Sequence, residues 1–185
     1  MDLCLSSKYY GPSVWGHSRG TERTAMWLAP IVNAAVVTSG ISGLTHDLGS
    51  ITEGRDGKNG EGHHRVGARK IKAIMMDLGY PRKIIYQVQY CIYSHRGSAD
   101  IPRITLEARV VASADAINHF ERIDELWQVG QRDRHLDVDE TYAWLAKKLE
   151  KDWQKIMPEV RELVRDKYIK AWLTLMRLYA REAAC

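Results

Sequence analysis

Helical periodicity constrains this chain more than any other feature of its sequence. Apolar residues recur at every third or fourth position in most segments, as they do from Val66 to Leu78. Glycine and proline separate such segments, with Gly79 after one of them and Pro81 before the next. No stretch of useful length shows the alternation of a β-strand. The sequence therefore predicts an all-α protein.

Breaker and capping residues set the expected helix boundaries. The pattern predicts helices over 13–28, from Pro30 towards His46, over 66–78, from Pro81, over 103–120, from Asp137 and from Pro158. Gly40 and Gly43 are expected to weaken the second of these helices. The five glycines between Gly49 and Gly62 predict a loop that can close over a bound molecule.

Length and composition exclude several protein classes. A chain of 185 residues is long enough for one domain with a core and short for two, so we expect a single domain over 1–185. The longest apolar stretch, near Trp27 to Val37, is interrupted by Pro30 and Asn33, which argues against a membrane span. The N-terminal residues lack a basic segment followed by an apolar one, which predicts a cytoplasmic protein.

Cysteine usage and charge narrow the choice further. The three cysteines are far apart and form no C-x-x-C pair, which argues against a disulfide framework and a thiolate zinc site. The net charge of +4 is spread along the chain. It is compatible with a small anionic substrate and does not favour nucleic acid as a partner.

Histidines and aspartates stand where predicted helices meet loops. In chain order they are His17, the adjacent pair His46-Asp47, His63, His95 and Asp115. Imidazole and carboxylate groups suit Mn, Fe, Co, Ni, Zn or Mg, depending on geometry. An adjacent His-Asp pair can send two ligands to one cation, and an aspartate can bridge two cations through its two oxygens. Because facing helices commonly build such cavities, the sequence predicts a metal site inside a helical bundle.

This order of residues, H…HD…H…H…D, resembles the HD superfamily of metal-dependent phosphohydrolases over about residues 14–120. The segment around Asp115 is similar to that of small bacterial and archaeal HD hydrolases. The chain departs from the common pattern at Ser50, where many members have Lys or Asp, and at Gly20, where a helix former is usual. The resemblance implies an HD-domain helical bundle with a metal-binding core at about 14–120 and an amphipathic helical extension at about 121–185.

The resemblance also implies a ligand set. His17, His46, Asp47 and Asp115 match the positions that bind the family's common metal. His63 and His95 match the positions that bind a second metal, bridged by Asp47, in dinuclear members. Asp47, His63 and His95 are therefore the candidate catalytic residues, and His63 or His95 could instead act as acid or base beside a single metal.

The implied activity is hydrolysis of a nucleotide or another small phosphate monoester or diester by a metal-activated water. Basic residues beside the ligands, or in the glycine-rich loop, are candidates for binding the phosphate: Arg19, Lys58, Arg65, Arg69 and Arg96. Acidic residues of the same loop are candidates for protonating the leaving group: Glu53, Asp56 and Glu61. We interpret His64 as a neighbour of His63 only, and His119 and His135 as structural or solvent-exposed.

Two other functions stay open. A few HD-type proteins with this ligand set use a di-iron centre to oxidise their substrates with dioxygen, and the identity of the metal would separate them from hydrolases. The chain could also be a non-catalytic module that binds a nucleotide or a partner protein. The C-terminal helices, with Trp144, Trp153 and Trp172, would suit a homodimer interface.

Overall fold

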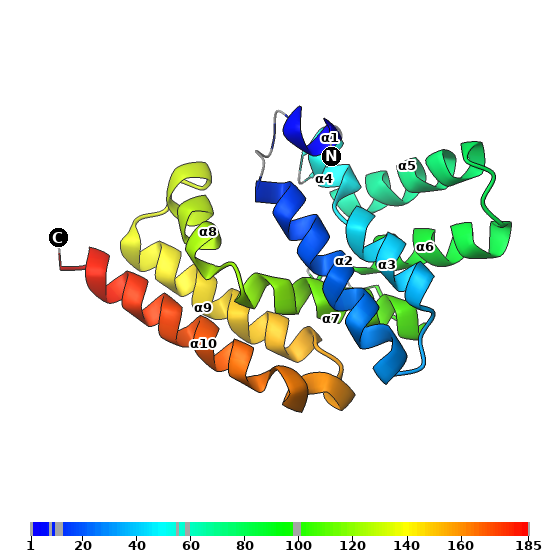
Figure 1. Cartoon of the computed structure of the whole chain (residues 1–185). Helices are drawn as coiled ribbons and strands as arrows, with labels where there is room; N and C mark the ends of the chain where they lie inside the picture. The colour runs from blue at the N-terminus through cyan, green and yellow to red at the C-terminus, as the bar shows by residue number, and fades with distance from the viewer. Residues whose placement is uncertain are drawn as a thin grey trace. The chain divides into compact units, whose positions relative to one another are not determined.

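The computed structural model of the chain describes residues 2–7, 9, 13–54, 56, 57, 60–97 and 101–184 (Figure 1). None of these residues lies in a strand, which confirms the all-α prediction. The helices are α1 (Asp2–Leu5), α2 (Ser13–Ile31), α3 (Val36–Thr45), α4 (Leu48–Glu53), α5 (His63–Asp77), α6 (Arg82–Ser94), α7 (Leu106–Phe120), α8 (Ile123–Gln128), the π-helical η1 (Val129–Asp133), α9 (Val138–Lys155) and α10 (Pro158–Glu182). No helix in the described ranges is long and apolar enough to cross a membrane.

The chain divides into two compact units, residues 1–115 and 116–185, with the boundary inside α7. The first unit ends close to the limit expected for the metal-binding core, and the second corresponds to the expected C-terminal extension. That the two form one domain stays a prediction.

In the first unit, α2 and α3 lie side by side (Figure 1). Gly43 faces the backbone of α2 closely enough that an added β carbon would lie 3.0 Å from the carbonyl oxygen of Thr21. An added β carbon at Gly40 would lie 2.9 Å from the side chain of Met26. The two glycines therefore allow the helices to approach closely, which offsets the low helix propensity expected to weaken α3.

Pro30 lies inside α2, so the prediction that it opens the second helix is wrong. Its missing N–H removes one hydrogen bond in the final turn, where the loss is small because the helix ends one residue later. Asn33 then adopts a left-handed conformation, with φ of 57°, and the N–H of Ala34 donates to the carbonyl oxygen of Ala29 at 2.8 Å. Asparagine tolerates this conformation better than most residues, which explains why the chain turns here.

The expected loop at 49–62 begins only after Glu53, because α4 is helical. A β carbon at Gly49 would lie 2.0 Å from the carbonyl oxygen of His63, so this glycine allows α4 to contact the start of α5. Gly54, Gly57 and Gly60 do have positive φ values, as a loop requires.

Helices α5 and α6 form a hairpin that encloses an apolar core (Figure 1). Gly79, with φ of 73°, ends α5, and the N–H of Tyr80 donates to the carbonyl oxygen of Met75 at 3.0 Å. The buried core residues are Leu48, Ala68, Ile71, Met75, Ile85, Val88 and Ile92. This core fixes α4, α5 and α6, whose ends carry several of the predicted ligands.

In the second unit, α9 and α10 lie side by side (Figure 1). Asp137 caps α9 by accepting from the N–H of Glu140 at 2.8 Å, and Pro158 is the first residue of α10, as predicted. Trp153 stacks on Tyr168 with ring centroids 4.5 Å apart, so this tryptophan packs inside the unit. Helices α1, α8 and η1 were not expected, because four to six residues are too few to show a period.

Candidate metal centre

The six predicted ligands lie in, or directly beside, six helices. His17 lies in α2 and Asp115 in α7. His46 and Asp47 form the junction between α3 and α4, His63 is the first residue of α5, and His95 follows α6 directly. The structure brings all six side chains together within the first unit, although they are spread over nearly one hundred positions of the chain.

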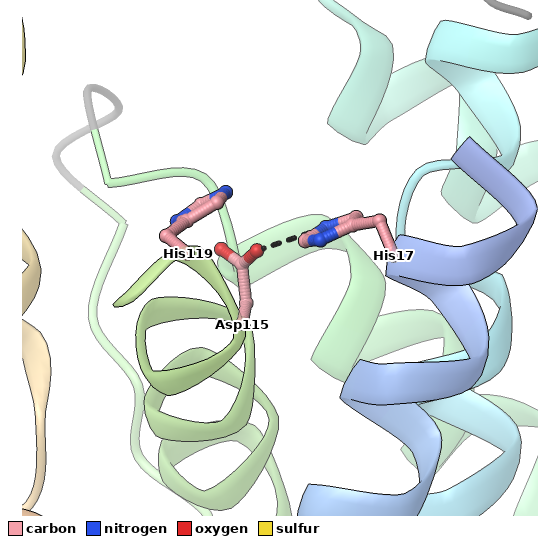
Figure 2. Close-up of side chains that lie close together, drawn as sticks. All are labelled: His17, Asp115 and His119. Carbon is pink, nitrogen blue, oxygen red and sulfur yellow. Dashed lines mark ion pairs between the residues drawn. The ribbon is translucent and has the colours of Figure 1, made fainter. Parts of the chain in front are cut away.

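Four side chains gather on one side of this centre. The Nε2 atoms of His17 and His46 lie 3.0 Å apart, and Asp115 Oδ1 lies 3.3 Å and 3.5 Å from them, respectively. Figure 2 shows the His17 ring and the Asp115 carboxylate facing each other from α2 and α7. Asp47 Oδ2 completes the group, at 3.8 Å from His17 and 3.5 Å from His46.

Two further imidazoles face the other oxygen of the same aspartate. The Nε2 atoms of His63 and His95 lie 3.2 Å apart. Asp47 Oδ1 lies 3.6 Å from the first and 3.8 Å from the second. Asp47 therefore directs one carboxylate oxygen to each group, which is the arrangement that a bridging ligand requires.

The spacing of these atoms fits divalent cations. Bonds of about 2.0–2.2 Å from a metal to nitrogen or oxygen place neighbouring ligand atoms about 3.0–3.5 Å apart in tetrahedral or octahedral geometry. Within the two groups, neighbouring ligand atoms lie 3.0–3.8 Å apart, which is close to this range. Both groups can therefore hold a metal ion with small movements of the side chains.

Backbone carbonyls fix the orientation of two rings. His46 Nδ1 donates to the carbonyl oxygen of Gly43 at 2.8 Å, and His95 Nδ1 donates to that of Ile92 at 2.6 Å. In the neutral ring, each bond places the proton on Nδ1 and leaves Nε2 as the nitrogen that can bind a cation at the centre. Metal-binding histidines are commonly held in this way.

Electrostatics also favour cations. Burial opposes ionisation of Asp47, but His46, His95 and His63 outweigh it and hold its pKa well below the ordinary value. Burial likewise opposes protonation of His46, yet Asp47 and Asp115 raise its pKa to about 9. For His95 burial prevails and lowers the pKa to about 4. The carboxylates of Asp47 and Asp115 thus favour positive charge at His46, as they would favour a cation.

The predicted phosphate-binding residues have different surroundings. Arg19 pairs with Glu22, and Arg69 pairs with Glu61. Arg65 lies over the ring of Tyr93, 5.6 Å from its centroid. Lys58 lies outside the described residues.

Arg96 and the acidic residues of the loop also have partners. Arg96 Nη2 lies 3.7 Å from Asp56 Oδ1, and Lys70 Nζ lies 3.1 Å from Glu53 Oε1. The hydrogen bond from Arg69 lowers the pKa of Glu61, which disfavours Glu61 as a proton donor.

Sequence reasoning missed three residues beside the centre. The Ser50 hydroxyl donates to Asp47 Oδ1 at 3.3 Å, a contact that its position three residues after Asp47 could have indicated. Arg103 donates from Nε to the carbonyl oxygen of Ser94 at 3.1 Å, and burial lowers its pKa. His64 is buried, and burial together with the charges of His63 and Arg96 lowers its pKa to about 4. No sequence signal distinguished Arg103 or His64.

Helices that converge on a cluster of histidines and aspartates define an all-helical protein built around a candidate metal centre. A family model for the HD domain matches residues 14–118, a span that includes His17 to Asp115. The chain therefore belongs to the HD domain family, as its sequence predicted.

Two solved structures are similar to this chain. The first is a predicted HD superfamily hydrolase from an uncultured Thermotogales bacterium, with a TM-score of 0.59, 18% sequence identity, and coverage of 97% of this chain and 88% of that one. The second is a predicted HD superfamily hydrolase involved in NAD metabolism from Clostridium acetobutylicum, with a TM-score of 0.41, 20% identity, and coverage of 91% and 94%. The first likeness supports the fold. No curated protein sequence matches the chain significantly.

Proposed function

We propose that this protein is a metal-dependent phosphohydrolase that acts on a nucleotide or another small phosphate ester. The observation that carries the proposal is the divided environment of Asp47. Its Oδ2 faces His17 and His46, whereas its Oδ1 faces His63 and His95. Such an arrangement suits two cations bridged by one carboxylate, the site on which many phosphoryl-transfer enzymes rely.

The ligands divide naturally between two positions. His17, His46, Asp115 and one oxygen of Asp47 would hold the first cation, and His63, His95 and the other oxygen of Asp47 would hold the second. Two divalent ions there would supply Lewis-acid activation of a water molecule and of a phosphoryl oxygen.

The surrounding residues keep the ligands ionised or oriented so that they can bind cations. The low pKa of Asp47 keeps the carboxylate ionised and able to accept on both oxygens. The carbonyl oxygens of Gly43 and Ile92 hold the His46 and His95 rings in one tautomer. Ser50 donates to Asp47 Oδ1 and restrains the carboxylate further.

The substrate would also need positive charge from the protein. Arg65 and Arg96 follow His63 and His95 closely in sequence, so both guanidinium groups belong to the ends of ligand-bearing helices. A guanidinium can bind two phosphate oxygens at once, which orients the ester as well as neutralising it.

The first test is elemental analysis of protein purified without added metal or chelator. Close to two equivalents of Mn, Co, Ni or Zn per chain would support the proposal. Two equivalents of iron together with substrate-dependent oxygen uptake would overturn it in favour of an oxygenase. No metal after reconstitution would remove its basis.

The second test is a screen of phosphate monoesters, diesters and nucleotides with the metal-loaded protein. The Asp47→Asn variant should lower hydrolysis to background, because it removes the ionised bridging carboxylate while keeping the size of the side chain. Asp77→Asn, at an exposed position at the end of α5, is the matched control and should retain full activity. Equal activity of the wild type and Asp47→Asn would contradict the proposal.

A further inference from the structure

We propose that His64 and Arg96 form an anion-binding subsite next to the second cation position, and that the substrate carries two adjacent phosphate groups. This inference rests on the proposed function, because it assigns one phosphate to the cations and the other to the subsite. It names a narrower substrate class, the organic diphosphates.

His64 is the first observation that points to a missing ligand. The residue is only 5% exposed, and its Nδ1 atom has no hydrogen-bond partner in the described part of the chain. Buried polar atoms are nearly always hydrogen-bonded, since leaving one unpaired costs free energy. The Tyr93 ring, 5.8 Å from that of His64 between centroids, packs beside the imidazole and helps to hold it in this position.

Arg96 converges on the same point as His64. A β carbon built at Gly62 would lie 2.7 Å from Arg96 Nη1 and 2.9 Å from His64 Nδ1. Gly62 has φ of 88°, a conformation that favours glycine, and its lack of a β carbon lets the His64 and Arg96 side chains pack against its backbone. The His64 imidazole nitrogen and the Arg96 guanidinium nitrogen therefore lie close to each other against Gly62, and a phosphate oxygen that approaches this pair could contact both.

The charges around this volume suit an anion. Arg65, which lies over Tyr93, adds a second guanidinium to the same side of the structure. Arg96 pairs with Asp56, with 3.7 Å between Nη2 and Oδ1, and the Asp56 side chain is 74% exposed. A bound phosphate could therefore displace Asp56 from Arg96 at little cost, because exposed ion pairs contribute little.

The position of the subsite relates it to the metal centre. The rings of His63 and His64 are 6.0 Å apart between centroids, and His63 is a proposed ligand of the second cation. A phosphate held by His64 and Arg96 would therefore lie beside a phosphate held by the cations. A molecule with two linked phosphates could occupy both positions.

The test compares two hydrolysis-resistant probes on the manganese-loaded protein by isothermal titration calorimetry. Methylenediphosphonate carries two linked anionic groups and methylphosphonate carries one. The wild type should bind the first at least about tenfold more tightly, since a charge-assisted hydrogen bond is equivalent to about a tenfold change in affinity. Metal content is measured after each titration to show that the probe has not removed manganese.

Three substitutions locate the source of the preference. His64→Leu and Arg96→Gln should each weaken methylenediphosphonate binding about tenfold and leave methylphosphonate binding unchanged. His64→Asn, which can place an amide N–H near the position of Nδ1, should keep most of the preference. Arg82→Gln, at an exposed position of α6, is the matched control.

Two outcomes of these titrations would overturn the proposed anion-binding subsite. If both His64→Leu and Arg96→Gln keep the preference for methylenediphosphonate over methylphosphonate, the subsite proposal is overturned. An equal loss of affinity for the two probes would also overturn it, because it would indicate an effect through the metal centre. Circular dichroism checks that each variant is folded, and Arg96→Gln tests the subsite independently if the buried His64→Leu change unfolds the protein. If the preference depends on these residues but no phosphate ester is cleaved, the proposed function fails and the anion subsite stands.

Discussion

Asp47 lies in the short connection between the end of α3 and the start of α4, and its two oxygens face different pairs of histidines. This position makes the six ligands unequal. Each histidine serves one proposed cation, whereas Asp47 serves both. Substitutions should therefore separate the two cations from each other.

We expect Asp47→Ala to reduce the metal content from two equivalents to none. His95→Ala should leave one equivalent, because it removes a ligand of the second cation only, and His17→Ala should likewise affect only the first. Elemental analysis of the dialysed proteins measures this directly, with Asp77→Asn as the control. Retention of two equivalents by Asp47→Ala would exclude a bridging role.

Asp152 is a buried acidic residue outside the metal centre. Its Oδ2 lies 3.0 Å from His119 Nδ1 and 3.1 Å from Lys148 Nζ, all within the second unit. Burial opposes its ionisation, but His119, Lys148 and Lys155 outweigh burial and lower the pKa of Asp152 to about 2. Because this value is below the ordinary 3.8, ionised Asp152 stabilises the folded protein above pH 4.

Asp152→Asn should therefore destabilise the protein by about 2 kcal/mol at neutral pH, since one pKa unit corresponds to about 1.4 kcal/mol. The difference from the wild type should shrink as the pH falls from about 4 to about 2, where the wild-type carboxylate becomes protonated. Urea unfolding at several pH values measures it. The exposed Asp166→Asn variant on α10 should show no such pH dependence, and a constant difference for Asp152→Asn would contradict the explanation.

At the scale of helices, close backbone contacts decide how the ligand-bearing segments meet. Gly49 in α4 contacts the first turn of α5, which begins with His63. Gly40 in α3 contacts only the flexible end of the Met26 side chain. The same substitution at these two positions should therefore have different effects.

We expect Gly49→Ala to destabilise the protein by about 1–3 kcal/mol, as overpacked cores are, because its β carbon would meet backbone atoms that cannot move independently. It should also weaken metal binding by separating Asp47 from His63. Gly40→Ala should cost less, since Met26 can change rotamer and alanine favours the helix by about 1 kcal/mol. Thermal unfolding and metal analysis test both, and equal effects would argue against a backbone contact at Gly49.

At the scale of the whole molecule, every proposed ligand belongs to the first of the two compact units. Ions bound by residues of six helices should stabilise that unit when it is folded, because the unfolded chain cannot present the ligands together. The second unit contains none of the six residues, so direct stabilisation by metal should be confined to the first.

Removal of the metal with a chelator should accordingly lower the unfolding free energy, by about 2.7 kcal/mol if the free ion had been present at a hundred times its dissociation constant. Hydrogen exchange should become faster in α3, α5 and α6 and remain unchanged in α9 and α10. Re-addition of manganese should restore protection in the wild type and leave Asp47→Ala unprotected. Faster exchange in α9 and α10 alone would contradict this expectation.

The sequence by itself determined the features that depend on neighbouring residues. Helical periodicity gave the all-α class, and the capping signals placed the starts of α9 at Asp137 and of α10 at Pro158, because helix formation and capping are local. The order of His17, His46-Asp47, His63, His95 and Asp115 was enough to indicate the HD family. The same local reasoning failed at Pro30, which lies in the last turn of α2 where a lost hydrogen bond costs little, and at Gly49, where contact with α5 outweighed local preference.

Only the tertiary structure decided which atoms meet. Which oxygen of Asp47 faces which histidines depends on how four helix ends are packed. The position of Arg103 behind His95, and the convergence of His64 and Arg96 over Gly62, likewise depend on packing. Such distances between remote residues follow from the burial of many side chains at once, so no motif or period in the sequence specifies them.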